Sequence, residues 1–162
     1  DNLFNFQKKY IKSYESDNSI TFDKWIESSV KEEEKNFLVQ MDIEGSEYEV
    51  INSVSEKNLK RIKILIIEFH HLEFLSNEVF LENFQSTLKK IANYFEISHI
   101  HPNNCCGISK IKNVTFPNVL EITFLNKDFV KTKDKVNKLP HELDIKNVAS
   151  KEDIILPDYW YI

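Results

Sequence analysis

The hydrophobic pattern is clearest around an apolar run that leads into a carboxylate-rich loop. Residues 36–42 are mostly apolar, and the loop that follows them contains Gly45. Ser46 and Glu49 match the spacing of a capping box, so we expect a helix from there to about Ser53. The pattern thus predicts a buried strand, a loop and a helix. In open α/β sheets ligands bind beyond the carboxyl ends of the strands, so a site is expected at this loop.

Further segments extend the same alternation. Residues 62–70 are apolar at successive positions, as in an interior parallel strand. Residues 78–95 carry apolar side chains at helical spacing, and residues 95–101 and 119–125 have the composition of strands. Strands that alternate with helices predict an α/β fold with a mostly parallel sheet. Because only a loop joins the last two strands, we expect one antiparallel strand near the edge of the sheet.

The N-terminal segment shows a weaker helical pattern. Phe6, Tyr10 and Tyr14 follow one another at four-residue intervals, which predicts a short amphipathic helix. Asp23 is predicted to cap a second helix that runs to about Lys31.

The length of the chain fits a single domain over residues 1–162. Its core is expected at residues 20–126. Residues 127–162 are polar and end in an aromatic tail, so we expect a C-terminal extension whose tail could dock on the domain or on a partner.

Charge and hydropathy argue against two kinds of partner. The formal net charge is −5 and Arg61 is the only arginine. Nucleic-acid binding favours a basic face, so no nucleic acid is expected as a partner. The apolar runs are far shorter than the roughly 20 residues that a helix needs to cross a bilayer, so no membrane span is expected.

The cysteines bear on the redox state and location of the protein, and the methionine bears on whether the sequence is trimmed. Cys105 and Cys106 are adjacent, whereas a disulfide framework needs separated pairs. We therefore expect reduced thiols and a cytoplasmic protein. The sequence begins with aspartate and its only methionine is Met41, so we expect a trimmed piece of a longer protein.

Polar side chains that could transfer protons or bind a metal lie at the ends of the two central predicted strands. Asp42 and Glu44 could orient or deprotonate an acceptor hydroxyl or hold a divalent metal, or they could be strand-end carboxylates stabilised by the helix dipole. Glu68 and His70 share a strand face, and an imidazole beside a carboxylate suits a general base. The alternative for His70 is a structural bond to a loop carbonyl. Glu47 is expected to be solvated or to cap the helix.

A second polar group follows the strand at residues 95–101. His101, Asn103 and Asn104 could bind the hydroxyl groups of a sugar, although Pro-Asn-Asn is also an ordinary turn sequence. A divalent-metal site is a further alternative, and its expected ligands are Asp42, Glu44, His70 and His101. Their spacing matches no zinc motif.

Several sequence blocks, in order over residues 20–126, resemble the FkbM-type S-adenosylmethionine-dependent methyltransferases. The most specific block is DIEGSEYEVI at residues 42–51, which is similar to the family pattern D-[IV]-E-G-x-E-x-x-[VL]-[LI]. The other blocks are ITFDKWI at 20–26, IEFH at 67–70, HIHPNN at 99–104 and PNVLEITF at 117–124.

The resemblance implies the C-terminal half of a Rossmann-like methyltransferase sheet, with S-adenosylmethionine as cofactor. It favours a functional role for Asp42 and Glu44, so for such an enzyme we expect Asp42 and His70 as catalytic residues and a cofactor contact for Asp42 and Glu44. Contacts to the substrate are then expected from Glu68, His101, Asn103 and Asn104. The glycine-rich loop that holds the cofactor in such folds is missing, because the two glycines of the chain are isolated from each other.

Two functions from different classes are therefore expected. The first is methyl transfer to an oxygen of a small or glycan-like acceptor, carried out by a C-terminal portion of the enzyme. The second is a non-catalytic, methyltransferase-like binding module, which the missing glycine loop and the aromatic tail favour. In either case the chain could form a homo-oligomer or pair with a missing N-terminal half.

Overall fold

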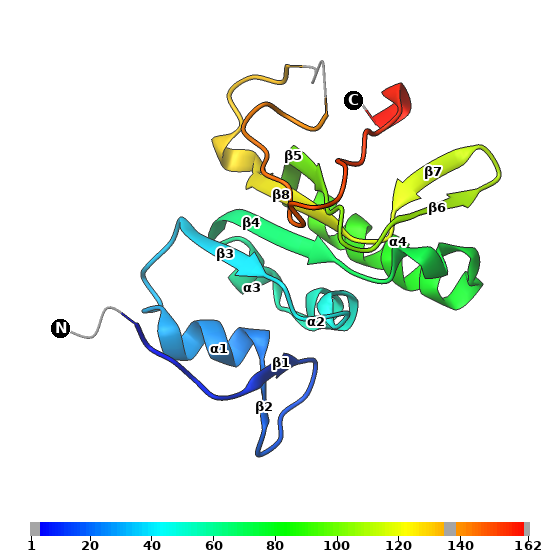
Figure 1. Cartoon of the computed structure of the whole chain (residues 1–162). Helices are drawn as coiled ribbons and strands as arrows, with labels where there is room; N and C mark the ends of the chain where they lie inside the picture. Colours follow the sequence, from blue (N-terminus) through cyan, green and yellow to red (C-terminus); the bar gives the residue numbers. More distant parts are fainter. Residues whose placement is uncertain (1–3, 135–138, 161–162) are drawn as a thin grey trace.

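The centre of the structure is a mixed sheet of four strands in the order β3-β4-β8-β5 (Figure 1). The computed structural model describes residues 4–134 and 139–160. The strands are β3 (Phe37–Met41), β4 (Ile62–Phe69), β8 (Leu120–Asn126) and β5 (Phe95–Pro102). β3 pairs with β4 in parallel, and β8 is antiparallel to both β4 and β5. The expected antiparallel strand is confirmed, one position from the edge, and β3 forms the opposite edge.

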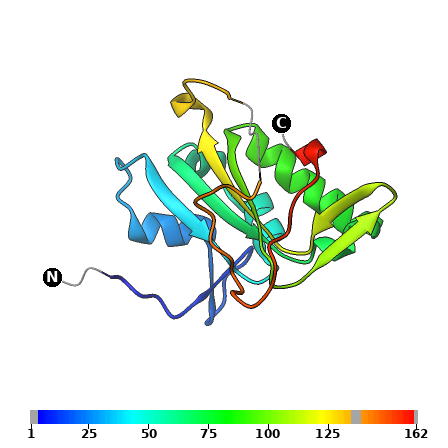
Figure 2. The ribbon, with the colours of Figure 1, turned by 45° about the horizontal axis from the view of Figure 1, so that its top comes forward.

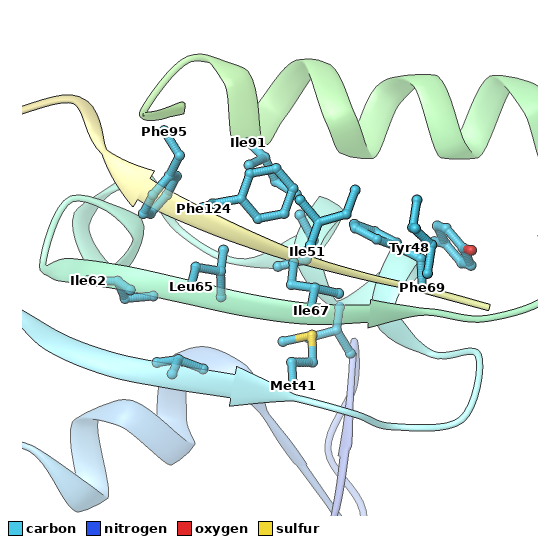
Figure 3. Close-up of a cluster of buried hydrophobic side chains, with 14 of the residues drawn as sticks. Met41, Tyr48, Ile51, Ile62, Leu65, Ile67, Phe69, Ile91, Phe95 and Phe124 are labelled. Carbon is cyan, nitrogen blue, oxygen red and sulfur yellow. The ribbon is translucent and has the colours of Figure 1, made fainter. Parts of the chain in front are cut away.

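Helices cover one face of this sheet and bury its apolar side chains. The helices are α1 (Phe22–Ser29), α2 (Glu47–Ser53), α3 (Glu56–Leu59) and α4 (Glu78–Ala92). Figure 3 shows Tyr48 and Ile51 of α2 and Ile91 of α4 between the helices and the strands. Along β4 the buried side chains alternate with partly exposed ones. One face of the strand therefore belongs to the core, and the other face is less covered and partly exposed to solvent.

Short elements complete the described fold. They are β1 (Tyr10–Lys12), β2 (Ser19–Thr21), β6 (Ile108–Ile111), β7 (Val114–Pro117) and the 3-10 turns Leu72–Ser76, Lys127–Phe129 and Asp158–Trp160. The hairpin β6–β7 projects beyond the end of the sheet (Figures 1 and 2). Within the described residues no helix is both long and apolar enough to cross a membrane.

The amphipathic helix predicted from Phe6, Tyr10 and Tyr14 is wrong. Residues 10–12 form β1, which pairs in parallel with β2. The three aromatic side chains are 84%, 73% and 57% exposed, so they pack little against the described part of the chain. A short helix without such packing is marginal in water, whereas strand pairing satisfies the backbone groups of this segment.

The predicted cap at Asp23 is also wrong. Thr21 caps α1, and its hydroxyl accepts a hydrogen bond from the backbone N–H of Lys24 at 3.4 Å. The Asp23 carboxylate instead accepts bonds from the backbone N–H and the hydroxyl of Ser55 and from the side chain of Asn58. Asp23 therefore ties α1 to the start of α3.

The described part of the C-terminal extension docks on the domain. Leu156 is buried, and the indole N–H of Trp160 donates to the backbone carbonyl of Thr115 in β7 at 3.1 Å. The Tyr159 hydroxyl bonds to the same residue. Residues 135–138 of the predicted extension and Tyr161 of the predicted tail lie outside the described residues.

Candidate active site at the carboxyl ends of the central strands

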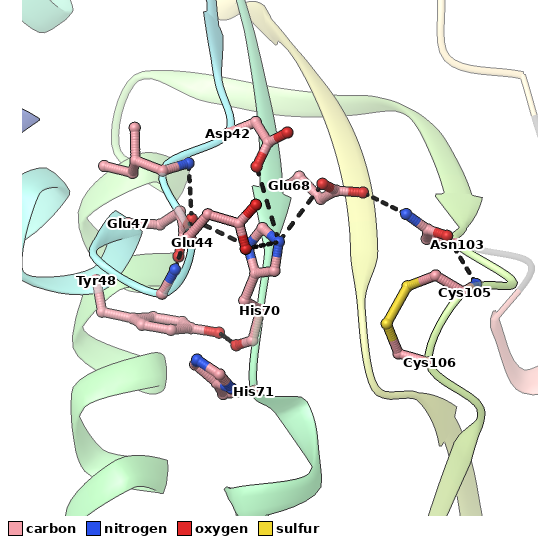
Figure 4. Close-up of polar contacts among 12 residues, drawn as sticks. Asp42, Glu44, Glu47, Tyr48, Glu68, His70, His71, Asn103, Cys105 and Cys106 are labelled. Atoms are coloured by element: carbon pink, nitrogen blue, oxygen red, sulfur yellow. Dashed lines mark hydrogen bonds and ion pairs between the residues drawn. A yellow bond between two sulfur atoms is a disulfide. The ribbon is translucent and has the colours of Figure 1, made fainter. Parts of the chain in front are cut away.

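The parallel pairing of β3 and β4 brings their polar ends together. Asp42 directly follows β3 and His70 directly follows β4, while Glu68 is the penultimate residue of β4. Because parallel strands end at the same edge of a sheet, the three side chains meet there. Figure 4 shows Asp42, Glu44 and Glu68 around the ring of His70.

A buried carboxylate shapes the loop between β3 and α2. The Oε1 atom of Glu47 accepts hydrogen bonds from the backbone N–H groups of Ile43 at 3.2 Å and Gly45 at 3.1 Å. Ser46 makes no side-chain cap bond, so the predicted capping box is wrong. The expectation of a solvated Glu47 is wrong as well, because its side chain is fully buried and stabilises the loop from inside.

Gly45 is required by this loop for two reasons. Its backbone has a φ of +96°, a left-handed conformation that residues with a Cβ rarely adopt. A Cβ added there would lie 2.7 Å from Cδ2 of His71, well inside van der Waals contact. The glycine thus allows the loop to pass close to the residue after His70.

His70 lies at the centre of the polar group. Its Nδ1 atom is 3.1 Å from Oε1 of Glu47. Its Nε2 atom faces three carboxylates, at 3.5 Å from Glu68, 3.6 Å from Glu44 and 3.7 Å from Asp42. The ring therefore has a buried carboxylate behind it and more exposed carboxylates in front. Among the described residues it makes no bond to a loop carbonyl, the alternative that we considered for it.

Glu68 connects this group to the loop after β5. The side-chain amide of Asn103 donates to Oε1 of Glu68 at 2.6 Å, and the Asn103 oxygen accepts from the backbone N–H of Cys105 at 2.8 Å. Burial raises the pKa of the Glu68 carboxyl, and the neighbouring Asp42 charge acts in the same direction, while the Asn103 bond opposes them.

One polar row continues across the sheet from Glu68. In the strand register Glu68 lies opposite Glu121 of β8, and Glu121 lies opposite His101 of β5. Directly opposed residues of antiparallel strands point to the same face, so these three side chains lie on the less covered face of the sheet. His101 therefore belongs to this row, while Glu68 is its member beside His70.

The sequence of this region matches a known family. A family model described as the methyltransferase FkbM domain matches residues 4–97, more than half of the chain. The chain belongs to the FkbM methyltransferase family. No curated protein and no solved structure matches it.

The matched part of this FkbM chain contains Asp42, Glu44, Glu68 and His70, which are the residues that the structure brings together. The remaining predicted site residues, His101, Asn103 and Asn104, lie beyond the match.

Asn104 forms hydrogen bonds to the C-terminal extension of the FkbM chain. Its side-chain amide donates to the backbone carbonyls of Val148 at 3.0 Å, Lys151 at 3.3 Å and Glu152 at 3.4 Å. Its oxygen accepts from the Val148 N–H at 2.8 Å. Asn104 thus contacts the extension, and a contact of its side chain with a substrate stays a prediction.

The two cysteines of the FkbM chain are not free thiols. Cys105 and Cys106 form a disulfide between neighbours (Figure 4), so the expectation of reduced thiols is wrong. The bond joins adjacent residues and closes no long loop, so it does not act as the framework of a secreted domain. The cytoplasmic location stays a prediction.

Sequence reasoning also missed Tyr48 of the FkbM chain. Its hydroxyl donates to the backbone carbonyl of His70, and burial raises the pKa of this phenol, so it stays protonated and keeps donating. The available signal was the D-x-E-G-x-E-x sequence itself, in which Glu47 and Tyr48 follow the loop glycine at fixed spacing.

Proposed function

We propose that this chain is an S-adenosylmethionine-dependent methyltransferase, or the C-terminal portion of one, that methylates an oxygen of a small or glycan-like acceptor. The family match over residues 4–97 carries the proposal, since it contains the polar group around His70. The strand order β3-β4-β8-β5, with one reversed strand, supports the C-terminal half of a Rossmann-like sheet.

The residues at the carboxyl edge of the sheet could bind only part of S-adenosylmethionine. Asp42 and Glu44 offer exposed carboxylates, which can accept hydrogen bonds from the hydroxyl and ammonium groups of S-adenosylmethionine. The chain has two separated glycines and hence no glycine-rich loop for the carboxylate end of the cofactor. We therefore assign to Asp42 and Glu44 a share of the cofactor site, and a missing N-terminal half would supply the rest.

In this reaction the chain would position the acceptor and remove the proton of its hydroxyl group. When bound, S-adenosylmethionine supplies an activated methyl group on a sulfonium sulfur. Asp42 or Nε2 of His70 would accept the proton of the acceptor hydroxyl, since both face the same space. Glu68 and Asn103 would hold neighbouring hydroxyls in line for attack, and His101 would extend this contact along β5.

The test is a calorimetric titration of the chain with S-adenosylhomocysteine, followed by transfer of a labelled methyl group to a panel of sugars and small alcohols. We expect weak binding, because the chain holds only a share of the cofactor site, and we expect Asp42→Asn to lower the rate of transfer by about 100-fold or more, as for loss of a general base. Glu82→Gln, an exposed carboxylate on α4, is the control. The proposal is contradicted if the wild-type chain neither binds S-adenosylhomocysteine nor transfers a methyl group.

The missing glycine loop favours a second candidate, a non-catalytic binding module. A module would unfold cooperatively, yet it would give no heat with S-adenosylhomocysteine. Sizing by light scattering would then show whether it forms a homo-oligomer.

A further inference from the structure

Three side chains at the carboxyl edge are placed to bind one ion. Among the described residues, the ligand atoms of Asp42, Glu68 and His70 all lie within 4.8 Å of one another. We propose that these three residues hold a divalent first-row transition-metal ion, with Glu44 as a further oxygen donor within reach. The set differs from the one expected from the sequence, since Glu68 takes the place of His101.

The hydrogen bond behind His70 fixes which ring nitrogen is available. A carboxylate oxygen can only accept, so the contact of Nδ1 with Glu47 requires the hydrogen to be on Nδ1. In the neutral ring Nε2 then carries a lone pair, and it faces three carboxylates that also only accept. Asn103 donates only to the other oxygen of Glu68, so four acceptors converge on one space, which calls for a cation between them.

The distances favour a metal ion over a proton shared by hydrogen bonds. The separations of 3.5 to 3.7 Å between Nε2 and the carboxylate oxygens exceed those of ordinary N–H···O bonds. Two ligands that each lie about 2.1 Å from an ion, in tetrahedral directions, are about 3.4 Å apart. Small side-chain movements would therefore place these atoms around one ion.

Glu47 supplies an independent observation. Its side chain is fully buried, its Oε1 atom supports the Nδ1 side of His70, and its Oε2 atom has no hydrogen-bond partner within residues 4–134 and 139–160. A buried carboxylate that receives the second ring N–H is the usual partner of a metal-binding histidine, because it orients the ring and raises its basicity. An incompletely satisfied negative charge behind the ring also favours positive charge in front of it.

The ligand types indicate which ion would bind. Mg²⁺ and Ca²⁺ prefer all-oxygen sites, whereas an imidazole with two carboxylates suits Mn²⁺, Fe²⁺ or Zn²⁺. Asp42 and Glu44 are 50% and 85% exposed, so the front of the site is open to solvent. An ion there would keep positions for water or for an oxygen of another molecule, as catalytic metal sites do.

One consequence rests on the proposed function. An ion bound to Asp42 and to Nε2 of His70 would occupy both proposed proton acceptors. It would instead lower the pKa of an acceptor hydroxyl bound to it, which makes deprotonation possible without a free base.

The test is titration of the chelator-treated chain of residues 1–162 with Zn²⁺, Mn²⁺ and Mg²⁺, each alone, with heat and thermal stabilisation as readouts. We expect one equivalent of Zn²⁺ or Mn²⁺ to bind, with Zn²⁺ at least about tenfold tighter than Mg²⁺. His70→Gln and Asp42→Asn should each weaken Zn²⁺ binding by about tenfold or more.

His71→Asn is the matched control, because His71 is the next residue, is half-exposed and contacts Glu73 outside the group. Asp42→Asn decides the question if His70→Gln does not fold, since Asp42 lies at the surface. The proposal is overturned if the wild-type chain binds neither Zn²⁺ nor Mn²⁺ at about 1 mM, or if the ligand variants bind them as tightly as the control. The titration contains no methyl donor, so its result is independent of the methyltransferase assay.

Discussion

At the scale of single residues, the buried Glu47 connects the loop of the candidate site to the ring of His70. One of its oxygens holds the backbone of the loop at Ile43 and Gly45 and also contacts His70. The loop that presents Asp42 and Glu44 and the ring that faces them are therefore fixed by the same buried group. A substitution that moves the loop is therefore expected to move the ring of His70 as well, and the reverse.

Gly45 offers a sharp test of that arrangement. Gly45→Ala should lower the free energy of unfolding by about 1–3 kcal/mol, because alanine is strained at this φ and its Cβ would press on His71. Gly107→Ala is the matched control, since Gly107 also has a positive φ but no atom within 4 Å of an added Cβ.

Urea denaturation of both variants separates the two effects. The excess cost at Gly45 over Gly107 should fall when His71→Ala is added, because that change removes the contact. Equal costs at the two glycines would show that the approach of His71 is unimportant.

At the scale of elements, hydrogen bonds from polar side chains join one helix to another. Asp23 reaches from α1 to Ser55 and Asn58 at the start of α3. Lys90 of α4 donates to the carbonyls of Asn52 at 2.8 Å and Val54 at 2.6 Å at the end of α2. These bonds set how the helices lie beside the strands that end at the site.

Asp23→Ala is expected to destabilise the chain by about 1–3 kcal/mol, because it leaves the donors at Ser55 and Asn58 unpaired. Asp17→Ala, in an exposed turn, is the control and should change stability little. Chemical denaturation followed by circular dichroism measures both. A cost at Asp23 no larger than at Asp17 would mean that the α1–α3 connection contributes nothing to stability.

Elements with regular periodicity could be predicted from the sequence, and those set by tertiary contacts could not. The apolar runs at β3, β4 and β8 and the spacing in α4 identify these elements directly. The spacing of Phe6, Tyr10 and Tyr14 was misleading because a helix needs a surface to pack on. The polar ends of β3 and β4 followed from strand direction, but the burial of Glu47 depends on a loop conformation that no pattern encodes.

At the scale of the whole molecule, the C-terminal extension is tied back to the domain near the candidate site. Asn103 contacts Glu68, and the next residue, Asn104, holds the backbone at 148–152. His99 of β5 adds a contact to Asp144 at 2.8 Å. The loop after β5 thus faces the polar group on one side and the extension on the other.

Asn104→Asp should release the extension, because a carboxylate would face three carbonyl oxygens and lose their donor. Limited proteolysis should then cut residues 141–156 several-fold faster than in the wild-type chain. Asn113→Asp, in the exposed turn of the β6–β7 hairpin, is the control. Unchanged cleavage would show that the Asn104 bonds do not hold the extension on the domain.

The position of β3 at the edge of the sheet has a consequence for handling the protein. Its outer backbone groups pair with no strand among the described residues, and Phe37–Met41 contains neither proline nor lysine to discourage pairing. Leu38 on this strand is 57% exposed. Concentrated solutions of the isolated chain are therefore expected to aggregate from this strand, and a peptide that covers it should keep the protein in solution.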